Sequence, residues 1–230
     1  MMDKSLFHVH TQRCGHASTE SDEAYVQRAI KIGAQSITFT DHAPFPGNPF
    51  GNRMPIEQLR EYVQSLRFLK EKYATVIDVR IGLEIEYLPS YLEYYQMLKL
   101  SGAFDILMIG QHFYEIENGR YSFELGKDEI AEKEFLGCGK AIVNGINSGF
   151  FDVVAHPDRM FRKKKEWYGE VEDSAKRIMA CAKKHGVLLE QNESSKRHAH
   201  YYREEFWKVV PNEMVVAGLD AHNVGALGLL

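Results

Sequence analysis

Residues 36–42, with the sequence SITFTDH, decide the fold: a short apolar and β-branched run ends in an aspartate and a histidine. Short runs of this kind are typical of strands that are buried on both faces of a parallel sheet. Seven such runs occur along the chain, with longer stretches between them. They are Ser5–Val9, Ser36–Thr40, Val79–Ile85, Phe104–Ile109, Phe151–Ala155, Val187–Gln191 and Met214–Leu219.

The stretches between these runs have the spacing of amphipathic helices. Val26, Ala29, Ile30 and Gly33 fall on one face of a helix, and Ser21 is placed to act as its N-cap. Further helices are predicted from Pro55 to about Tyr73, from Pro89 onward, and over about 127–147, 171–185 and 201–210.

The alternation of strands and helices favours the α/β class. Seven strand–helix units without a Pro-, Gly- or Ser-rich linker predict a single (β/α)7 TIM-like barrel over residues 1–230, one unit short of the eightfold barrel. An open, doubly wound sheet is the alternative.

The composition excludes several classes of protein. The chain has 230 residues and a net charge of −4, with 44% hydrophobic residues, which excludes disordered and collagen-like chains. This charge disfavours a stable complex with nucleic acid, and no apolar run approaches the roughly 18 residues of a membrane span. Three cysteines without a CxxC pair, and no signal-peptide pattern, predict a reduced, cytoplasmic protein.

Side chains that can bind metals lie at the carboxyl ends of six of the seven predicted strands. In a barrel, the carboxyl ends of the strands form the rim where active sites are built. Many imidazoles with a few carboxylates are the ligands of a divalent transition metal. Histidines with separate structural roles would gather at one rim only by coincidence. The candidate ligands are His8, His10, His16, His42, Glu84, His112, His156, Asp220 and His222.

The His-x-His pair adds a geometric argument. In a regular strand, alternate side chains point to the same side, so His8 and His10 can bind one ion while Val9 packs the other way. Arginine suits phosphate because its guanidinium offers paired donors, and Arg159 and Arg197 both follow predicted strands.

Six motifs in chain order resemble one known family. The sequence is similar to the PHP (polymerase and histidinol phosphatase) superfamily of metal-dependent phosphoesterases, and within it to the histidinol-phosphate phosphatases. The resemblance covers essentially the whole chain and fills nine ligand positions. The motifs are His8–His16, Thr40–Pro44, Gly82–Glu86, Gly110–Phe113, Ala155–Asp158 and Gly218–His222.

The resemblance implies a distorted (β/α)7 barrel that binds two or three divalent ions, which are zinc, iron or manganese. One ion would be held by His8, His10, Glu84 and Asp220. A second would share Glu84 and add His112 and His156. A third would take His16, His42 and His222.

The implied reaction is the hydrolysis of a small phosphomonoester. Three divalent ions and two carboxylates, Glu84 and Asp220, would leave a charge of about +4, which suits a phosphate dianion. A metal-bridging hydroxide would attack phosphorus in line. Asp158, or a metal-bound water, would protonate the leaving oxygen, and Arg159 and Arg197 would bind the phosphate.

L-histidinol phosphate is the predicted substrate, which would give the protein a role in histidine biosynthesis. Another small phosphate ester, a nucleotide or a phosphotyrosine remains open within the same chemistry. Amidohydrolase-like C–N hydrolysis is a further alternative, because those barrels also begin with His-x-His, although they commonly use a carboxylated lysine where Glu84 stands. A non-catalytic metal-binding module is the last alternative.

Overall fold

The computed structural model describes residues 4–117, 119–198 and 200–228, which fall into two compact units. Unit 1 contains residues 4–84, 98–107 and 217–228, and unit 2 contains residues 85–97 and 108–216. Seven strands are neighbours in chain order in one sheet. They are β1 (Ser5–Val9), β2 (Ser36–Phe39), β3 (Asp78–Ile85), β4 (Ile106–Ile109), β7 (Val153–Val154), β8 (Leu188–Asn192) and β9 (Val215–Gly218).

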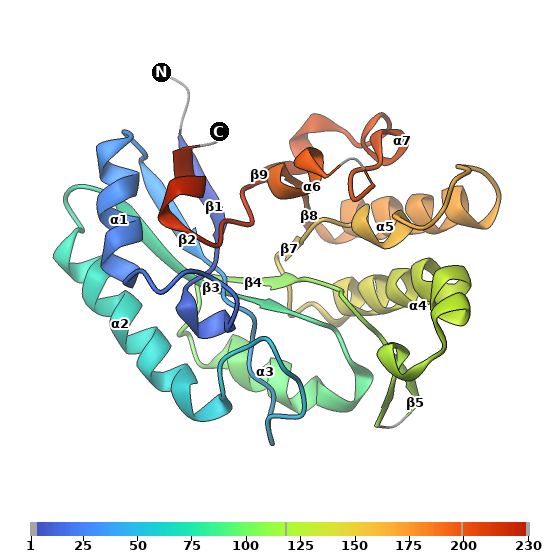
Figure 1. The fold of residues 1–230 in the computed structure, drawn as a ribbon, viewed down its shortest axis with the longest axis horizontal. Helices are drawn as coiled ribbons and strands as arrows, with labels where there is room; N and C mark the ends of the chain where they lie inside the picture. The colour runs from blue at the N-terminus through green and yellow to red at the C-terminus, as the bar shows by residue number, and fades with distance from the viewer. Residues whose placement is uncertain (1–3, 118, 199, 229–230) are drawn as a thin grey trace. The chain divides into compact units, whose positions relative to one another are not determined.

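Unit 1 is built on the parallel strands β1, β2 and β3. Ile37 of β2 lies opposite Leu6 of β1 and Val79 of β3, and all three side chains are fully buried. Helices α1 (Asp22–Lys31) and α2 (Leu59–Lys72) lie side by side along these strands (Figure 1). α1 begins where the sequence predicts, because Oγ of Ser21 accepts a hydrogen bond from the Ala24 N–H at 3.2 Å.

The last strand returns to the first within unit 1. The Leu219 N–H donates to the Phe7 carbonyl at 2.8 Å, and the His10 N–H donates to the Ala221 carbonyl at 2.9 Å. This pairing closes the order of strands, as in a barrel. The predicted α/β class with (β/α)7 order is therefore confirmed, and the open-sheet alternative is wrong. The single domain over 1–230 stays a prediction.

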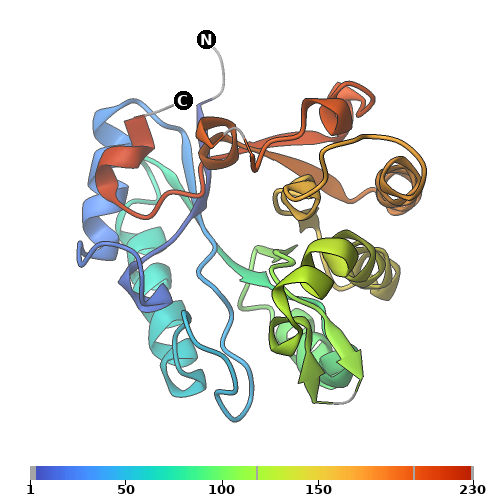
Figure 2. The ribbon, with the colours of Figure 1, turned by 45° about the vertical axis from the view of Figure 1, so that its right-hand side comes forward.

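Unit 2 contains β7, β8 and the last two residues of β4, which pair in parallel, with Val153 opposite both Met108 and Leu188. Helices α4 (Lys127–Ser148) and α5 (Glu170–His185) lie side by side in this unit (Figure 2). α5 ends at Gly186, whose φ of 67° is the left-handed conformation that glycine adopts without a steric cost. α3 (Leu92–Leu100) follows a 3₁₀ turn that begins at Pro89.

Some predicted boundaries differ from the structure. The helix predicted over 201–210 is only α7 (Glu204–Trp207), and the sequence did not predict the short α6 (Glu193–Arg197). It also missed the hairpin of β5 (Glu115–Glu117) and β6 (Arg120–Tyr121). These elements are too short to show a hydrophobic period. Among the described helices, none is long and apolar enough to span a membrane.

Candidate metal centre

The two histidines at the end of β1 meet tip to tip, with 2.9 Å between their Nε2 atoms. The prediction assumed a regular strand here, whereas the backbone at His8 departs from one. His8 has a φ of 66°, and the pairing of β1 with β2 shifts register between Leu6 and Val9. A left-handed histidine costs of order 1–3 kcal/mol, which the surrounding structure must offset. The bulge turns the His8 imidazole toward that of His10.

Two carboxylates complete a cluster of four donors in unit 1. Oε2 of Glu84 lies 3.3 Å from Nε2 of His8 and 3.4 Å from Nε2 of His10. Oδ1 of Asp220 lies 3.7 Å and 3.4 Å from the same two atoms. Two ligands that bind one ion at about 2.1 Å in tetrahedral geometry lie about 3.4 Å apart. The four side chains therefore fit a single divalent ion, as the resemblance implies, and we call them the four-donor cluster.

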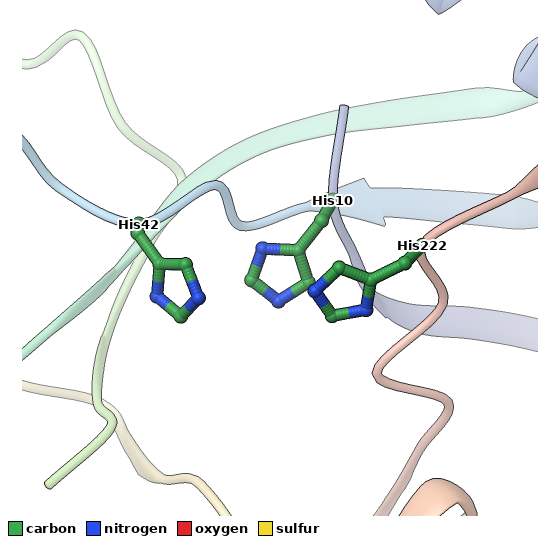
Figure 3. Close-up of side chains that lie close together, drawn as sticks. All are labelled: His10, His42 and His222. Carbon is green, nitrogen blue, oxygen red and sulfur yellow. The ribbon is translucent and has the colours of Figure 1, made fainter. Parts of the chain in front are cut away.

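A second group of imidazoles, those of His16, His42 and His222, lies beside this cluster. Nε2 of His222 lies 2.8 Å from Nε2 of His16, and Nδ1 of His42 lies 3.1 Å from Oε2 of Glu84. Figure 3 shows the rings of His10, His42 and His222 gathered from three separate segments, and their donor atoms lie within 4.8 Å of one another. Glu84 therefore contacts donors of both groups, which suits a carboxylate that binds two ions.

Backbone carbonyls set the orientation of two of these rings. Nδ1–H of His16 donates to the Cys14 carbonyl at 3.0 Å, and Nδ1–H of His222 donates to the Asp220 carbonyl at 3.0 Å. With the proton on Nδ1, the lone pair lies on Nε2, where the two rings face each other. Both rings therefore present an unprotonated Nε2 that a metal could bind.

Burial keeps two of the imidazoles uncharged. It lowers the pKa of His10 from 6.5 to about 4, against the opposing effect of the Asp220 carboxylate. It lowers the pKa of His222 to about 4 as well, and the neighbouring His10 adds to the shift. A metal binds the neutral imidazole, so these two side chains are in the binding form at neutral pH.

Two further predicted ligands, His112 and His156, lie in unit 2 with ring centroids 5.3 Å apart. Nδ1–H of His112 donates to Oε1 of Glu86 at 3.0 Å, which leaves its Nε2 for a metal. His156 has a φ of 31°, and its backbone N–H donates to Oε2 of Glu190 at 3.0 Å. Each of the two histidines is therefore supported by a buried carboxylate.

No role for either of these two carboxylates was predicted from the sequence. Glu190 lies in β8, after which no ligand was predicted, and it also accepts a hydrogen bond from Nδ2 of Asn192 at 3.2 Å. Glu86 directly follows β3. The available signal was an acidic residue in or beside an otherwise apolar strand, which is rare unless the charge has a partner.

Asp158, the predicted proton donor, is fully buried in unit 2. Its Oδ2 accepts a hydrogen bond from the Arg203 N–H at 2.8 Å. Burial raises the pKa of Asp158 from 3.8 to about 6, partly offset by this hydrogen bond. A carboxyl group in this range can hold a proton near neutral pH, and its catalytic role stays a prediction.

The two predicted phosphate-binding arginines differ in environment. Arg159 is half-buried, donates to Oγ of Ser195 at 3.2 Å, and lies over the ring of Tyr201 at 5.4 Å. Arg197 is the last residue of α6 and is exposed. Arg159 is therefore the more rigidly held of the two guanidinium groups.

Comparison with known proteins gives consistent matches. The PHP domain family model matches residues 7–194. A Deinococcus radiodurans protein named "Probable histidinol-phosphatase" is 35% identical over 162 residues, which are 66% of this chain and 59% of that protein. The histidinol-phosphatase of Bacillus subtilis is 30% identical over 148 residues, 60% of this chain and 54% of that protein. The matched region thus spans less than two thirds of either relative.

Solved structures share the fold over nearly the whole chain. A crystal structure from Listeria monocytogenes has a TM-score of 0.77 at 20% identity and covers 98% of this chain and 97% of its own. Histidinol phosphate phosphatase of Lactococcus lactis, solved with zinc, L-histidinol and phosphate, has a TM-score of 0.74 at 20% identity. That match covers 98% of this chain and 90% of the Lactococcus chain.

Proposed function

Because this chain belongs to the PHP domain family, we propose that it is a metal-dependent phosphomonoesterase with L-histidinol phosphate as its substrate. The observation that carries the proposal is the four-donor cluster, in which two imidazoles and two carboxylates converge at distances that suit one ion. The names of the relatives and the ligands of the Lactococcus structure support this substrate class. The reaction would belong to histidine biosynthesis.

We propose two or three divalent ions of zinc, iron or manganese. The four-donor cluster would hold one, and His16, His42 and His222 would hold another. His112 and His156 are proposed as ligands of a further ion. Bound ions of this kind lower the pKa of a coordinated water and stabilise negative charge on a phosphoryl group.

The remaining side chains would act on the substrate itself. Arg159 would donate paired hydrogen bonds to phosphate oxygens, with its guanidinium already held between Ser195 and Tyr201. Asp158 would supply the proton to the leaving oxygen. We also propose a reducing, cytoplasmic location, which the three free cysteines of the described chain support.

The experiment that tests the proposal combines metal analysis with two substrates. Protein purified without chelators should contain two or three zinc, iron or manganese ions per chain. Its kcat/KM for L-histidinol phosphate should exceed that for phenyl phosphate by at least about 100-fold, because contacts with the rest of the substrate contribute to transition-state binding. Chelator-treated protein, before and after metal is restored, is the control.

Other results of this experiment would change the proposal. Turnover of phenyl phosphate without preference for histidinol phosphate would leave a phosphoesterase for another small ester. Bound metal without turnover of any phosphoester would favour the C–N hydrolase or the non-catalytic module.

Substitution of Arg159 should affect phosphate binding more than substitution of Arg197. Arg159→Lys keeps the positive charge but loses the paired N–H donors of the guanidinium, so the KM for L-histidinol phosphate should rise about 10-fold or more. Arg197→Gln, at an exposed position, should raise KM about threefold. Asp158→Asn should lower kcat rather than raise KM if this group supplies a proton. Steady-state kinetics on both substrates measures all three, and equal KM values in Arg159→Lys and the unmodified protein would contradict the phosphate role.

A further inference from the structure

Every N–H group of the Arg13 guanidinium has an acceptor in unit 1. Nη1 and Nη2 donate to the two carboxylate oxygens of Asp22 at 2.7 and 2.9 Å. Nε and Nη2 donate to the two oxygens of Glu61, both at 2.9 Å. Nη1 also donates to Oγ1 of Thr11 at 3.0 Å. A guanidinium has five N–H donors in a fixed plane, and all five are used here.

Thr11 links Arg13 to Asp41, which lies beside the predicted ligand His10. Because Oγ1 of Thr11 accepts from Arg13, its hydroxyl hydrogen is directed to Oδ2 of Asp41 at 2.6 Å. The Thr11 backbone N–H donates to the other oxygen of Asp41 at 2.7 Å. Both oxygens of this fully buried carboxylate are thus fixed by one residue.

Asp41 lies behind the imidazole of His10. Its Oδ1 is 3.9 Å from Nδ1 of His10, while Nε2 of the same ring faces the other three side chains of the four-donor cluster. Within the described part of the chain, Nδ1 of His10 has no hydrogen-bond partner. A metal-bound histidine usually directs its second ring nitrogen toward a carboxylate, carbonyl or water, and this outer contact orients the ligand.

Arg13 also fixes the loop that leads to His16. It lies in the 3₁₀ turn Gln12–Cys14, and the carbonyl of Cys14 accepts the hydrogen bond from His16. Asp22 is the first residue of α1, and Glu61 lies in the first turn of α2. The guanidinium therefore ties the turn between two predicted ligands to two helices.

We propose that Arg13 is a positioning residue of the metal centre. It holds the loop that carries two ligands, and through Thr11 it keeps Asp41 behind His10. Lysine at this position would keep the charge but not the planar set of five donors. The inference rests on the proposed metal centre and is independent of the substrate.

The test measures zinc binding to metal-free protein by competition with a chromophoric chelator. Arg13→Gln is expected to raise the zinc Kd about 10- to 100-fold, the usual effect of losing a contact that orients a ligand. Arg13→Lys should restore only part of the affinity. Thr11→Val keeps the hydrogen bonds from Arg13 to Asp22 but removes the Thr11 hydroxyl, so it should also raise the zinc Kd at least about 10-fold.

Ser65→Ala is the matched control at the same helix junction. Ser65 donates to Oδ2 of Asp22 at 2.6 Å and does not belong to the path to His10. Its zinc Kd should stay within about threefold of the unmodified protein, even if its melting temperature falls. The visible spectrum of bound Co²⁺ should change in Arg13→Gln and Thr11→Val but not in Ser65→Ala.

A purely structural role for Arg13 makes the opposite prediction. The metal-free Arg13→Gln protein would then melt at a lower temperature and bind zinc with an unchanged Kd, which would overturn the inference. If Arg13→Gln does not fold, Thr11→Val decides, and an unchanged Kd there also overturns it. An unmodified protein that binds no zinc would reject the proposed metal centre itself, so the two failures are distinguishable.

Discussion

Replacing Glu84 with glutamine is expected to remove bound metal and phosphatase activity together. Oε2 of Glu84 lies within 3.4 Å of nitrogen atoms of His8, His10 and His42, so one carboxylate serves two groups of donors. The amide has the same shape but carries no charge. We expect kcat/KM to fall at least about 1,000-fold, which corresponds to about 4 kcal/mol of transition-state stabilisation.

The same substitution should not destabilise the metal-free protein. Glu84 is 1% exposed, and its carboxylate and that of Asp220 both lie 3.4 Å from Nε2 of His10. Two buried carboxylates at one site repel each other when no cation lies between them. The metal-free Glu84→Gln protein should therefore melt at the same temperature as the unmodified protein or higher, whereas added zinc should stabilise only the unmodified protein.

Metal analysis, steady-state kinetics and thermal melting with and without zinc measure these effects. Glu172→Gln is the control, because Glu172 forms an exposed ion pair with Lys176 on α5. That variant should keep the metal content and the activity. Normal zinc content and turnover in Glu84→Gln would show that the site is wrongly assigned.

The strands and the four-donor cluster could be predicted because each depends on a local pattern. An apolar run predicts a buried strand, and a histidine or carboxylate just after it lies at the end of that strand. Glu84 lies within β3, and Asp220 lies just beyond β9. In a parallel sheet the carboxyl ends of the strands share one edge, so the pattern also predicts that these side chains approach one another.

The backbone conformation of three predicted ligands could not be predicted in this way. His8, His156 and Asp220 all have positive φ, at 66°, 31° and 52°. Residues with a Cβ atom rarely adopt this conformation, and no local sequence signal marks it for histidine. It depends on contacts with distant segments, such as the hydrogen bond from the Ala221 N–H to the His8 carbonyl at 3.0 Å.

The supporting residues were missed for a related reason. Arg13 binds partners 9 and 48 residues away, and Glu190 accepts a hydrogen bond from a residue 34 positions earlier. Sequence spacing does not show which charged side chains bind distant residues in the folded chain and which remain exposed to solvent. In both cases the structure shows a charged side chain that fixes the backbone beside a predicted ligand.

Asp220 is a predicted ligand with a left-handed backbone, and two substitutions should separate the effects of these two features. Asparagine adopts this conformation more readily than other residues with a Cβ atom, whereas alanine there costs about 1–2 kcal/mol. Asp220→Asn should therefore lose zinc affinity and activity by at least about 100-fold while the metal-free protein keeps its melting temperature. Asp220→Ala should lose the same activity and also unfold at a lower temperature.

The comparison of these two variants tests whether ligation or backbone conformation controls the site. The Asp220 carbonyl accepts the hydrogen bond from Nδ1–H of His222 at 3.0 Å, so a change in this backbone would also turn the ring of a second predicted ligand. If the asparagine variant retains zinc and only the alanine variant loses it, the conformation and not the carboxylate is essential. If both lose zinc equally while only the alanine variant is less stable, the metal is bound by Oδ1 of Asp220, which lies 3.4 Å from Nε2 of His10 and 3.7 Å from Nε2 of His8.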